Sequence, residues 1–305
     1  MICIVAPGQG SQTPGFLAPW LELQKFKESI QQSSEVLGMD LVHFGSEADA
    51  DSIRDTKIAQ PLIVAAGIAS FEVFKDRFGD SVSVQATAGH SVGEITAAFV
   101  AGILNRQDAL RFVMKRGEEM AAAALLTPTS MAAVVGGEQN QVLESLRANG
   151  LFAANFNGSG QIVAAGDQEK IGQLVANPPA GSRVVQLQVA GAFHTSFMEP
   201  AKAPLSEFAS GISASDPSIT IWTNSNGEKI TSGARFLDLL IQQVASPVRW
   251  DQTMESMARA GVKTMIELLP GGALSGIAKR AMPETTAIAI KSPADLDKVA
   301  DVLGK

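Results

Sequence analysis

The sequence predicts an α/β protein in which a mostly parallel sheet forms a large subdomain and a small ferredoxin-like subdomain is inserted into it. The first observation is the continuous apolar run Ile2–Ala6, which is typical of a strand buried on both faces of a sheet. The second is a strand–turn–helix pattern around Gly89–Gly93. The third is a βαββαβ order over about 65 residues, bounded by Thr127 and Gly191.

The stretch Gly89–Gly93 reads Gly-His-Ser-Val-Gly, between the apolar run Val82–Ala88 and the helical pattern Glu94–Phe99. This arrangement indicates a nucleophile elbow, in which glycines flank a turn too tight for side chains and the hydroxyl of Ser91 is exposed. The backbone N–H of Val92, at the start of the helix, would then face an oxyanion formed on the serine. The alternative is an ordinary glycine-rich turn with a buried serine.

The remaining elements of the large subdomain follow from apolar periodicity and capping residues. Pro61 fits the first turn of the helix Ala59–Phe78, and Asn105 fits the N-cap of the helix Arg106–Ala122. The other expected helices are Phe26–Val36, Ala203–Ala209, Phe236–Val244, Gln252–Ala260, Leu274–Arg280 and one from Ala294; the other expected strands are Ile219–Trp222, Thr264–Leu268 and Ala287–Ile290.

The small subdomain is expected to contain four strands and two helices in ferredoxin-like order. The strands are Met131–Val135, Leu151–Phe156, Gln161–Ala165 and Arg183–Val189, and the helices are Asn140–Arg147 and Asp167–Val175. We therefore divide the chain into a large subdomain, residues 1–126 and 193–305, and a small subdomain, residues 127–192.

Composition excludes several classes of protein. Hydrophobic residues make up 46% of the 305 residues and charged residues 18%, as in globular proteins. The net charge of −7 argues against a nucleic-acid partner. No apolar run reaches the roughly 18 residues of a membrane span, and the N-terminus does not resemble a signal peptide. The single cysteine, Cys3, fits a reducing cytoplasm, and three histidines without ligand spacing predict no metal site.

The glycine loop Gly8–Gln12 follows the first strand. It is not a dinucleotide-binding fingerprint, because Thr13 occupies the position of the third glycine and no terminal acid follows. The alternative is that the loop brings the backbone N–H of Gln9 to the elbow, as a second donor to an oxyanion.

A serine nucleophile needs a base, and histidine is the usual one near neutral pH. His194 is the best candidate, since it lies where the chain returns from the small subdomain to the large one. The side chain of His90 should point into the scaffold, and His43 lies in a mixed loop without a supporting pattern. Arg116 lies among apolar residues of a predicted helix. It could lie on a solvated face or be a buried cation, and the apolar periodicity of the helix does not distinguish between the two.

Several motifs occur together in a specific order. They are Gly8-Gln9-Gly10-Ser11-Gln12, Gly89-His90-Ser91-Val92-Gly93-Glu94, Arg116-Gly117, Asn155-Phe156-Asn157 before Gln161-Ile162-Val163, Ala192-Phe193-His194, and Pro247-Val248-Arg249-Trp250. From Met1 to about Arg280, this ordered set resembles the malonyl-CoA:acyl carrier protein transacylases of fatty acid synthesis. The resemblance implies an α/β-hydrolase-like large subdomain with a ferredoxin-like insert.

The resemblance also implies roles for individual residues. Ser91 would be the acylated nucleophile, and His194 its general base and later acid. The N–H groups of Gln9 and Val92 would form the oxyanion hole. Arg116 would bind the malonyl carboxylate through a bidentate pair.

Other roles concern the rest of the pocket. Asn157, Gln161 and Arg183 correspond to positions on the pantetheine and nucleotide side. A main-chain carbonyl around Arg249 would orient the histidine, so that no triad aspartate is needed. Phe193 resembles the malonyl-preferring pattern and is a hint against a methylmalonyl unit.

The expected reaction is therefore transfer of a malonyl group from malonyl-CoA to the phosphopantetheine thiol of an acyl carrier protein, through a malonyl-serine ester. The expected partners are malonyl-CoA and acyl carrier protein, with no nucleic acid and no membrane. We expect no resident cofactor, a monomer and a cytoplasmic location. The alternatives are a polyketide-type extender acyltransferase, a serine hydrolase or thioesterase, and a non-catalytic carrier-binding module.

Overall fold

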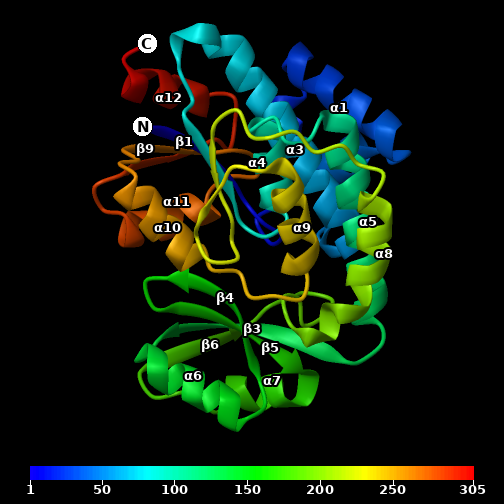
Figure 1. The fold of residues 1–305 in the computed structure, drawn as a ribbon, viewed down its shortest axis with the longest axis vertical. Helices are drawn as coiled ribbons and strands as arrows, with labels where there is room; N and C mark the ends of the chain where they lie inside the picture. Colours follow the sequence, from blue (N-terminus) through cyan, green and yellow to red (C-terminus); the bar gives the residue numbers. More distant parts are fainter.

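The computed structural model describes residues 1–305, apart from the side chain of Asp80. A large part with a six-stranded sheet lies above a smaller part with a four-stranded sheet in Figure 1. The strand order in the large sheet is β10-β9-β1-β2-β7-β8, and only the β7–β8 pair is antiparallel. The predicted α/β class with a mostly parallel sheet is thus confirmed.

The large subdomain consists of the six-stranded sheet and the helices around it. Its strands are β1 (Ile2–Ala6), β2 (Ala86–Gly89), β7 (Thr220–Trp222), β8 (Lys229–Ile230), β9 (Thr264–Glu267) and β10 (Thr286–Ala289). Its helices are α1 (Gln24–Leu37), α2 (Leu41–Ser46), α3 (Thr56–Phe78), α4 (Gly93–Val100), α5 (Arg106–Ala124), α8 (Glu199–Ala209), α9 (Gly233–Gln243), α10 (Trp250–Arg259), α11 (Ala273–Ala281) and α12 (Asp295–Leu303).

The central strand β1 is buried on both faces, as its continuous apolar run predicts. Ile4 packs into the core on the side of α3 and α4, whereas Cys3 and Val5 pack into a second core with Trp222 and Trp250. Helix α3 is long and apolar enough to cross a membrane, but 78% of its most apolar window is buried inside the protein. It is therefore the central helix of the larger core.

The small subdomain contains β3 (Thr129–Gly136), α6 (Gln139–Ala148), β4 (Phe152–Gly158), β5 (Gln161–Asp167), α7 (Gln168–Ala176) and β6 (Ser182–Gln186). Its strands form an antiparallel sheet in the order β4-β5-β3-β6, with α6 and α7 on the face away from the large subdomain (Figure 1). This is the ferredoxin-like insert that the element order predicts. The bounds 127–192 remain a prediction, and all four strands lie within them.

Three expectations about local structure were wrong. His43 lies in α2, where the side chain of Asp40 caps the helix, and not in a loop. Helix α3 begins at Thr56, because the Asp55 carboxylate accepts the N–H of Lys57, so Pro61 lies inside the helix and not in its first turn. The strand predicted over residues 183–189 ends at Gln186.

The two subdomains are joined by backbone hydrogen bonds as well as by the chain crossings. The edge strand β4 pairs with the segment around Val248: the Phe156 N–H donates to the Val248 carbonyl at 2.8 Å, and the Val248 N–H donates to the Ala154 carbonyl at 2.9 Å. The Arg249 guanidinium lies 4.5 Å from the centre of the Phe156 ring. The Pro-Val-Arg-Trp motif therefore fixes the small sheet against the large subdomain.

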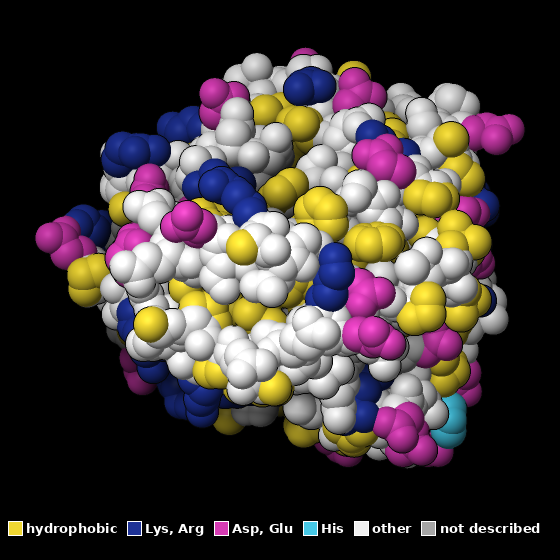
Figure 2. Space-filling model, turned by 90° about the horizontal axis from the view of Figure 1, so that it is seen from below, with side chains coloured by type: hydrophobic (Ala, Val, Ile, Leu, Met, Phe, Trp, Pro, Cys, Tyr) yellow, Lys and Arg dark blue, Asp and Glu magenta, His cyan; other side chains and the backbone are white. Residues whose placement is uncertain are grey.

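The first crossing of the chain between the subdomains leaves apolar side chains exposed to solvent. At the end of α5, where the chain enters the small subdomain, Leu125 and Leu126 are 84% and 69% exposed. Seen from the small-subdomain end, hydrophobic side chains gather on the side that carries α5 and α8 (Figure 2).

Helix α4 approaches the end of β1 very closely. A Cβ atom added to Gly93 would lie 2.2 Å from the Ala6 carbonyl oxygen and 2.7 Å from that of Pro7. Both obstacles are backbone atoms, so neither can rotate away. Glycine at this position is therefore required for the elbow to pack against the sheet.

We predict that Gly93→Ala lowers the free energy of unfolding by about 3 kcal/mol, the upper end of the usual range, because the added methyl group overpacks a site lined by backbone. Thermal and denaturant unfolding measure this loss. Gly172→Ala in α7 is the matched control: nothing lies within 4 Å of its Cβ position, so it should be neutral or stabilise by about 0.5–1 kcal/mol. Equal stability of the two variants would contradict the prediction.

Candidate active site

Ser91 lies on a strained turn between β2 and α4. Its φ of 53° is in the left-handed region, which non-glycine residues rarely adopt. The side chain of Asn224 clamps this turn: its Oδ1 accepts the Ser91 N–H at 2.7 Å, and its Nδ2 donates to the Gly89 carbonyl at 2.8 Å. The predicted nucleophile elbow is therefore present, with its backbone held by a buried amide.

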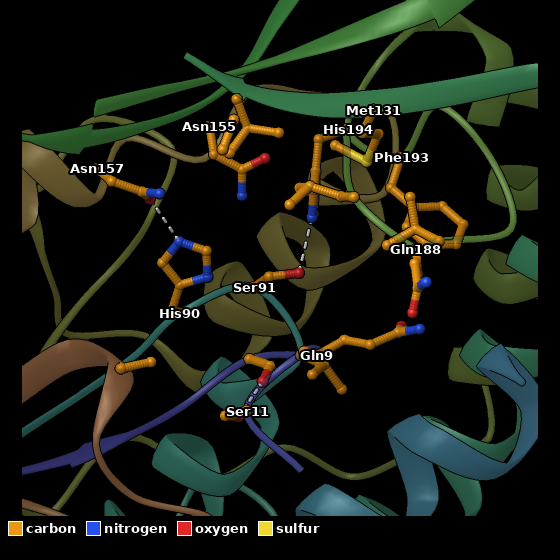
Figure 3. Close-up of a pocket in the computed structure, with 18 of the residues that line it drawn as sticks. Gln9, Ser11, His90, Ser91, Met131, Asn155, Asn157, Gln188, Phe193 and His194 are labelled. Atoms are coloured by element: carbon orange, nitrogen blue, oxygen red, sulfur yellow. Dashed lines mark hydrogen bonds between the residues drawn. The ribbon is translucent and has the colours of Figure 1, made fainter. Parts of the chain in front are cut away.

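His194 faces Ser91 from the opposite wall of the pocket (Figure 3). Its Nε2 lies 2.7 Å from the Ser91 Oγ, and its Nδ1 lies 2.8 Å from the Gln243 carbonyl oxygen. A carbonyl oxygen can only accept, so Nδ1 carries the proton and Nε2 offers its lone pair to the hydroxyl. This is the geometry of a general base on a serine.

The orientation of His194 corrects one prediction. The carbonyl in contact with it belongs to Gln243 and not to Arg249, which forms an ion pair with Asp251 at 2.7 Å. Gln243 is the last residue of α9, and the last carbonyls of a helix have no intrahelical partner. The Gln243 carbonyl accepts both the imidazole N–H and, at 3.1 Å, the backbone N–H of Ser246. The His194 N–H donates to the next one, that of Val244, at 3.0 Å.

Burial, with the charge of Arg116 as a second cause, lowers the pKa of His194 to about 3. The imidazole is therefore neutral near pH 7 and able to accept a proton. His90 lines the same cavity, but its Nε2 lies 2.9 Å from the Asn157 Oδ1, and its ring points away from the hydroxyl (Figure 3). His90 thus links the elbow to β4 and is not placed to act as the base.

Arg116 is 1% exposed, which settles the choice between a solvated face and a buried cation. Its Nη1 donates to the Gln60 Oε1 at 2.6 Å, and its Nη2 donates to the Gln243 Oε1 at 3.0 Å and to the Ser91 Oγ at 3.4 Å. Burial lowers its pKa to about 10, so the guanidinium stays charged near pH 7.

The partners of Arg116 are neutral. Among the described side chains, no carboxylate forms an ion pair with its guanidinium, and its Nε has no hydrogen-bond partner. A buried charge without a counterion is unfavourable unless a ligand supplies one. Because Arg116 also lines the cavity, the site is built to receive an anion beside Ser91.

The two predicted oxyanion donors both belong to residues that line the cavity. Gln9 and Val92 both line it, and within the described chain neither of their backbone N–H groups has an acceptor. The loop presses directly on the elbow: a Cβ on Gly8 would lie 2.8 Å from the His90 carbonyl oxygen. This arrangement leaves two N–H groups without acceptors, on residues that line the same cavity as the nucleophile, as an oxyanion hole requires.

The cavity has a volume of about 620 Å³ and lies between the elbow and the inner face of the small sheet. Asn157 and Gln161 line it, and their place on the pantetheine and nucleotide side stays a prediction. Arg183 does not: it is exposed on β6. Val135 on β3 pairs with Gln161 on one side and with Arg183 on the other, so Arg183 lies two strands away from Gln161, on the edge strand β6.

Comparisons with known proteins agree with this geometry. The acyl transferase domain family matches residues 3–304. The malonyl CoA-acyl carrier protein transacylase of Mycobacterium tuberculosis H37Rv is 43% identical over 302 residues, which cover 99% of this chain and 100% of that protein. The Escherichia coli K12 protein of the same name is 32% identical over 296 residues, 95% of each chain. The crystal structure of MCAT from Mycobacterium tuberculosis superposes with a TM-score of 0.94 at 44% identity, covering 98% of this chain and 99% of that one.

The chain belongs to the malonyl-CoA:acyl carrier protein transacylase family. The predicted resemblance is thereby confirmed, and so are the two-subdomain fold and the acyltransferase class.

Three residues of this transacylase site were missed by the sequence analysis: Gln60, Asn224 and Gln243. Asn224 follows β7, and the carboxyl ends of parallel strands lie at the same edge of a sheet. A polar residue just after that strand could therefore have been predicted to lie near the site. Gln243 ends α9 shortly before the Pro-Val-Arg-Trp motif. Gln60 lies inside the apolar α3 and carried no signal of its own.

We predict that the acylation of Ser91 by a small neutral ester such as p-nitrophenyl acetate keeps its rate from about pH 8 to about pH 5. A lowered pKa means that the proton binds only at lower pH, so the basic form of His194 persists over this range. Stopped-flow absorbance measures the rate, and His194→Ala should react slowly at every pH. A rate that halves near pH 6.5 would contradict the prediction.

Proposed function

We propose that the protein transfers the malonyl group from malonyl-CoA to the phosphopantetheine thiol of acyl carrier protein, through a malonyl ester on Ser91, and so supplies fatty acid synthesis. One observation carries this proposal: the buried guanidinium of Arg116 lies 3.4 Å from the Ser91 Oγ and has no anionic partner among the described residues. The names of the relatives, malonyl CoA-acyl carrier protein transacylases, support the same acyl group and carrier.

In the first half-reaction, His194 Nε2 takes the proton of the Ser91 hydroxyl as Oγ attacks the thioester carbonyl. The oxyanion that forms accepts hydrogen bonds from the N–H groups of Gln9 and Val92, and each such donor contributes about 3 kcal/mol. When the intermediate collapses, the carbon–sulfur bond breaks and His194 returns the proton to the departing sulfur. Coenzyme A leaves as a thiol, and the malonyl group remains on Ser91.

In the second half-reaction, the thiol of the carrier's phosphopantetheine attacks the malonyl ester. His194 takes the thiol proton and passes it to Ser91 Oγ as the ester bond breaks, which restores the free enzyme. The same two backbone donors stabilise the second oxyanion. Water must be kept from the ester between the two steps, and the burial of His194 and Arg116 supports this.

Arg116 provides the selectivity for a diacid. The malonyl carboxylate is separated from the ester carbon by one methylene group, so a cation within hydrogen-bonding distance of Oγ can reach it. A planar guanidinium can bind both carboxylate oxygens at once. We further propose that Asn157 and Gln161 contact the pantetheine arm, because both line the same cavity as Ser91.

The alternative functions fit less well. A serine hydrolase or thioesterase for neutral esters has no use for an unpaired buried cation beside its nucleophile. A polyketide-type extender acyltransferase shares the chemistry, but the relatives described above carry the transacylase name. We also propose that the enzyme acts as a monomer in the cytoplasm and needs no resident cofactor or metal, since serine-ester chemistry requires neither.

Incubation with malonyl-CoA in the absence of carrier should add one malonyl group to Ser91, because the first half-reaction is independent of the second. Intact-mass and peptide mass spectrometry detect the adduct. Addition of a phosphopantetheinylated acyl carrier protein should then remove it and produce the malonyl carrier. Ser91→Ala should show no adduct. A wild-type enzyme that stays unmodified would exclude the proposal.

Arg116→Ala should lower kcat/KM for malonyl-CoA by about a hundredfold more than that for acetyl-CoA, since hydrogen bonds to charged groups contribute about 1.5–3 kcal/mol. The matched control is Arg106→Ala in the same helix; Arg106 pairs with Glu72 and lies outside the cavity lining. It should leave the malonyl-to-acetyl ratio unchanged. Equal losses for both acyl groups in Arg116→Ala would remove Arg116 from its role.

A further inference from the structure

Glu94 is a buried carboxyl group that the reaction does not use. It lies in the first turn of α4, is 1% exposed and does not line the cavity. Its Oε1 accepts the backbone N–H of Asn224 at 2.9 Å, and its Oε2 accepts the side-chain Nε2 of Gln243. Burial raises its pKa to about 8, against the effects of the Asn224 N–H and of the charge on Arg116.

Gln243 connects Glu94 to the acyl pocket. Its side-chain nitrogen donates to Glu94, and its side-chain oxygen accepts from the Arg116 Nη2 at 3.0 Å. An arginine can only donate, so the amide has to present its oxygen to Arg116. Acceptance of the amide N–H by Glu94 fixes this orientation.

Asn224 connects Glu94 to the nucleophile. The Asn224 backbone is held by Glu94, while the Asn224 side chain accepts the Ser91 N–H and donates to the Gly89 carbonyl. Both neighbours of Glu94 therefore approach it as donors. In either protonation state both oxygens of a carboxyl group can accept, whereas an amide offers one acceptor and one donor.

We infer that Glu94 is a positioning residue: through the Gln243 side chain it orients the Arg116 guanidinium for the carboxylate of the acyl group. This inference rests on the proposed function, because it concerns the binding of an acyl carboxylate by Arg116. The His194 ring contacts Gln243 only at its backbone carbonyl, so the orientation of the base does not depend on which way the Gln243 side-chain amide points.

Glu94→Gln replaces one of two acceptor oxygens with an NH₂ donor, and this changes the orientation of the Gln243 amide. If the new amide oxygen accepts the Asn224 N–H, its NH₂ group faces the nitrogen of Gln243. The Gln243 amide must then turn over and present its NH₂ group to Arg116, where two donors meet. The guanidinium loses an acceptor and its fixed orientation, while the pair of Ser91 and His194 is retained.

The test compares Ser91 acylation by malonyl-CoA and by acetyl-CoA in wild type and Glu94→Gln. We expect kcat/KM for malonyl-CoA to fall at least about tenfold relative to that for acetyl-CoA. The matched control is Glu267→Gln: Glu267 is also fully buried and accepts two backbone N–H groups, of Leu274 and Ser275, but it has no contact with Gln243. It should lower the melting temperature without changing the malonyl-to-acetyl ratio.

A double-mutant cycle identifies the route. If Glu94 acts through the Gln243 side chain, Glu94→Gln should have no further effect on the ratio in a Gln243→Met background. Additive effects, or an unchanged ratio in the single Glu94→Gln variant, overturn the inference. If Glu94→Gln does not fold, Gln243→Met alone must lower the ratio, and an unchanged ratio there overturns it as well.

The outcome for Arg116→Ala separates this inference from the proposed function. If Arg116→Ala loses malonyl selectivity while Glu94→Gln keeps it, only the role of Glu94 fails. If wild type forms no malonyl-Ser91, the proposed function fails together with the inference; if it does form the ester but Arg116→Ala keeps the wild-type ratio, the role of Arg116 and the inference fail.

Discussion

The site depends on one buried cation that the protein solvates but does not neutralise. Gln60 and Gln243 give the Arg116 guanidinium oxygen acceptors, which offset part of the loss of water. A carboxylate in either place would have filled the position that the substrate has to occupy. A solvated arginine would have attracted an anion only weakly. Neutral amides in a buried site preserve both the charge and the space beside it that a substrate anion can occupy.

The residues around this cation come from segments far apart in the chain, and the fold explains why they meet. The elbow and the Gly8–Gln12 loop both follow parallel strands, β2 and β1, whose carboxyl ends share one edge of the sheet. Helix α9 ends beside them and contributes Gln243. The pairing of β4 with Val248 then holds the small sheet over the pocket.

Sequence reasoning succeeded where the signal was local. Ser91 was identified by its glycines and flanking elements, and the insert by its order of strands and helices. Reasoning was weaker where a role depends on which segments meet in space or on what covers an element. The carbonyl that orients His194 was assigned to Arg249 on the resemblance alone; the helix expected over Phe236–Val244 ends within one residue of Gln243, but the sequence does not show that this helix end lies beside His194. The burial of Arg116 could not be decided, since periodicity does not reveal which segments pack over a helix.

The base of this enzyme, His194, donates its Nδ1–H to a peptide carbonyl and not to an acidic side chain. A Ser-His-Asp triad places a permanent negative charge behind the imidazole, and that charge stabilises the imidazolium formed during attack. Here the acyl group brings its own negative charge into the pocket. A second anion there would repel the malonate and compete for the arginine. The carbonyl dipole at the end of α9 orients the imidazole ring without adding a second negative charge. The substrate carboxylate then becomes the counterion nearest to the imidazolium.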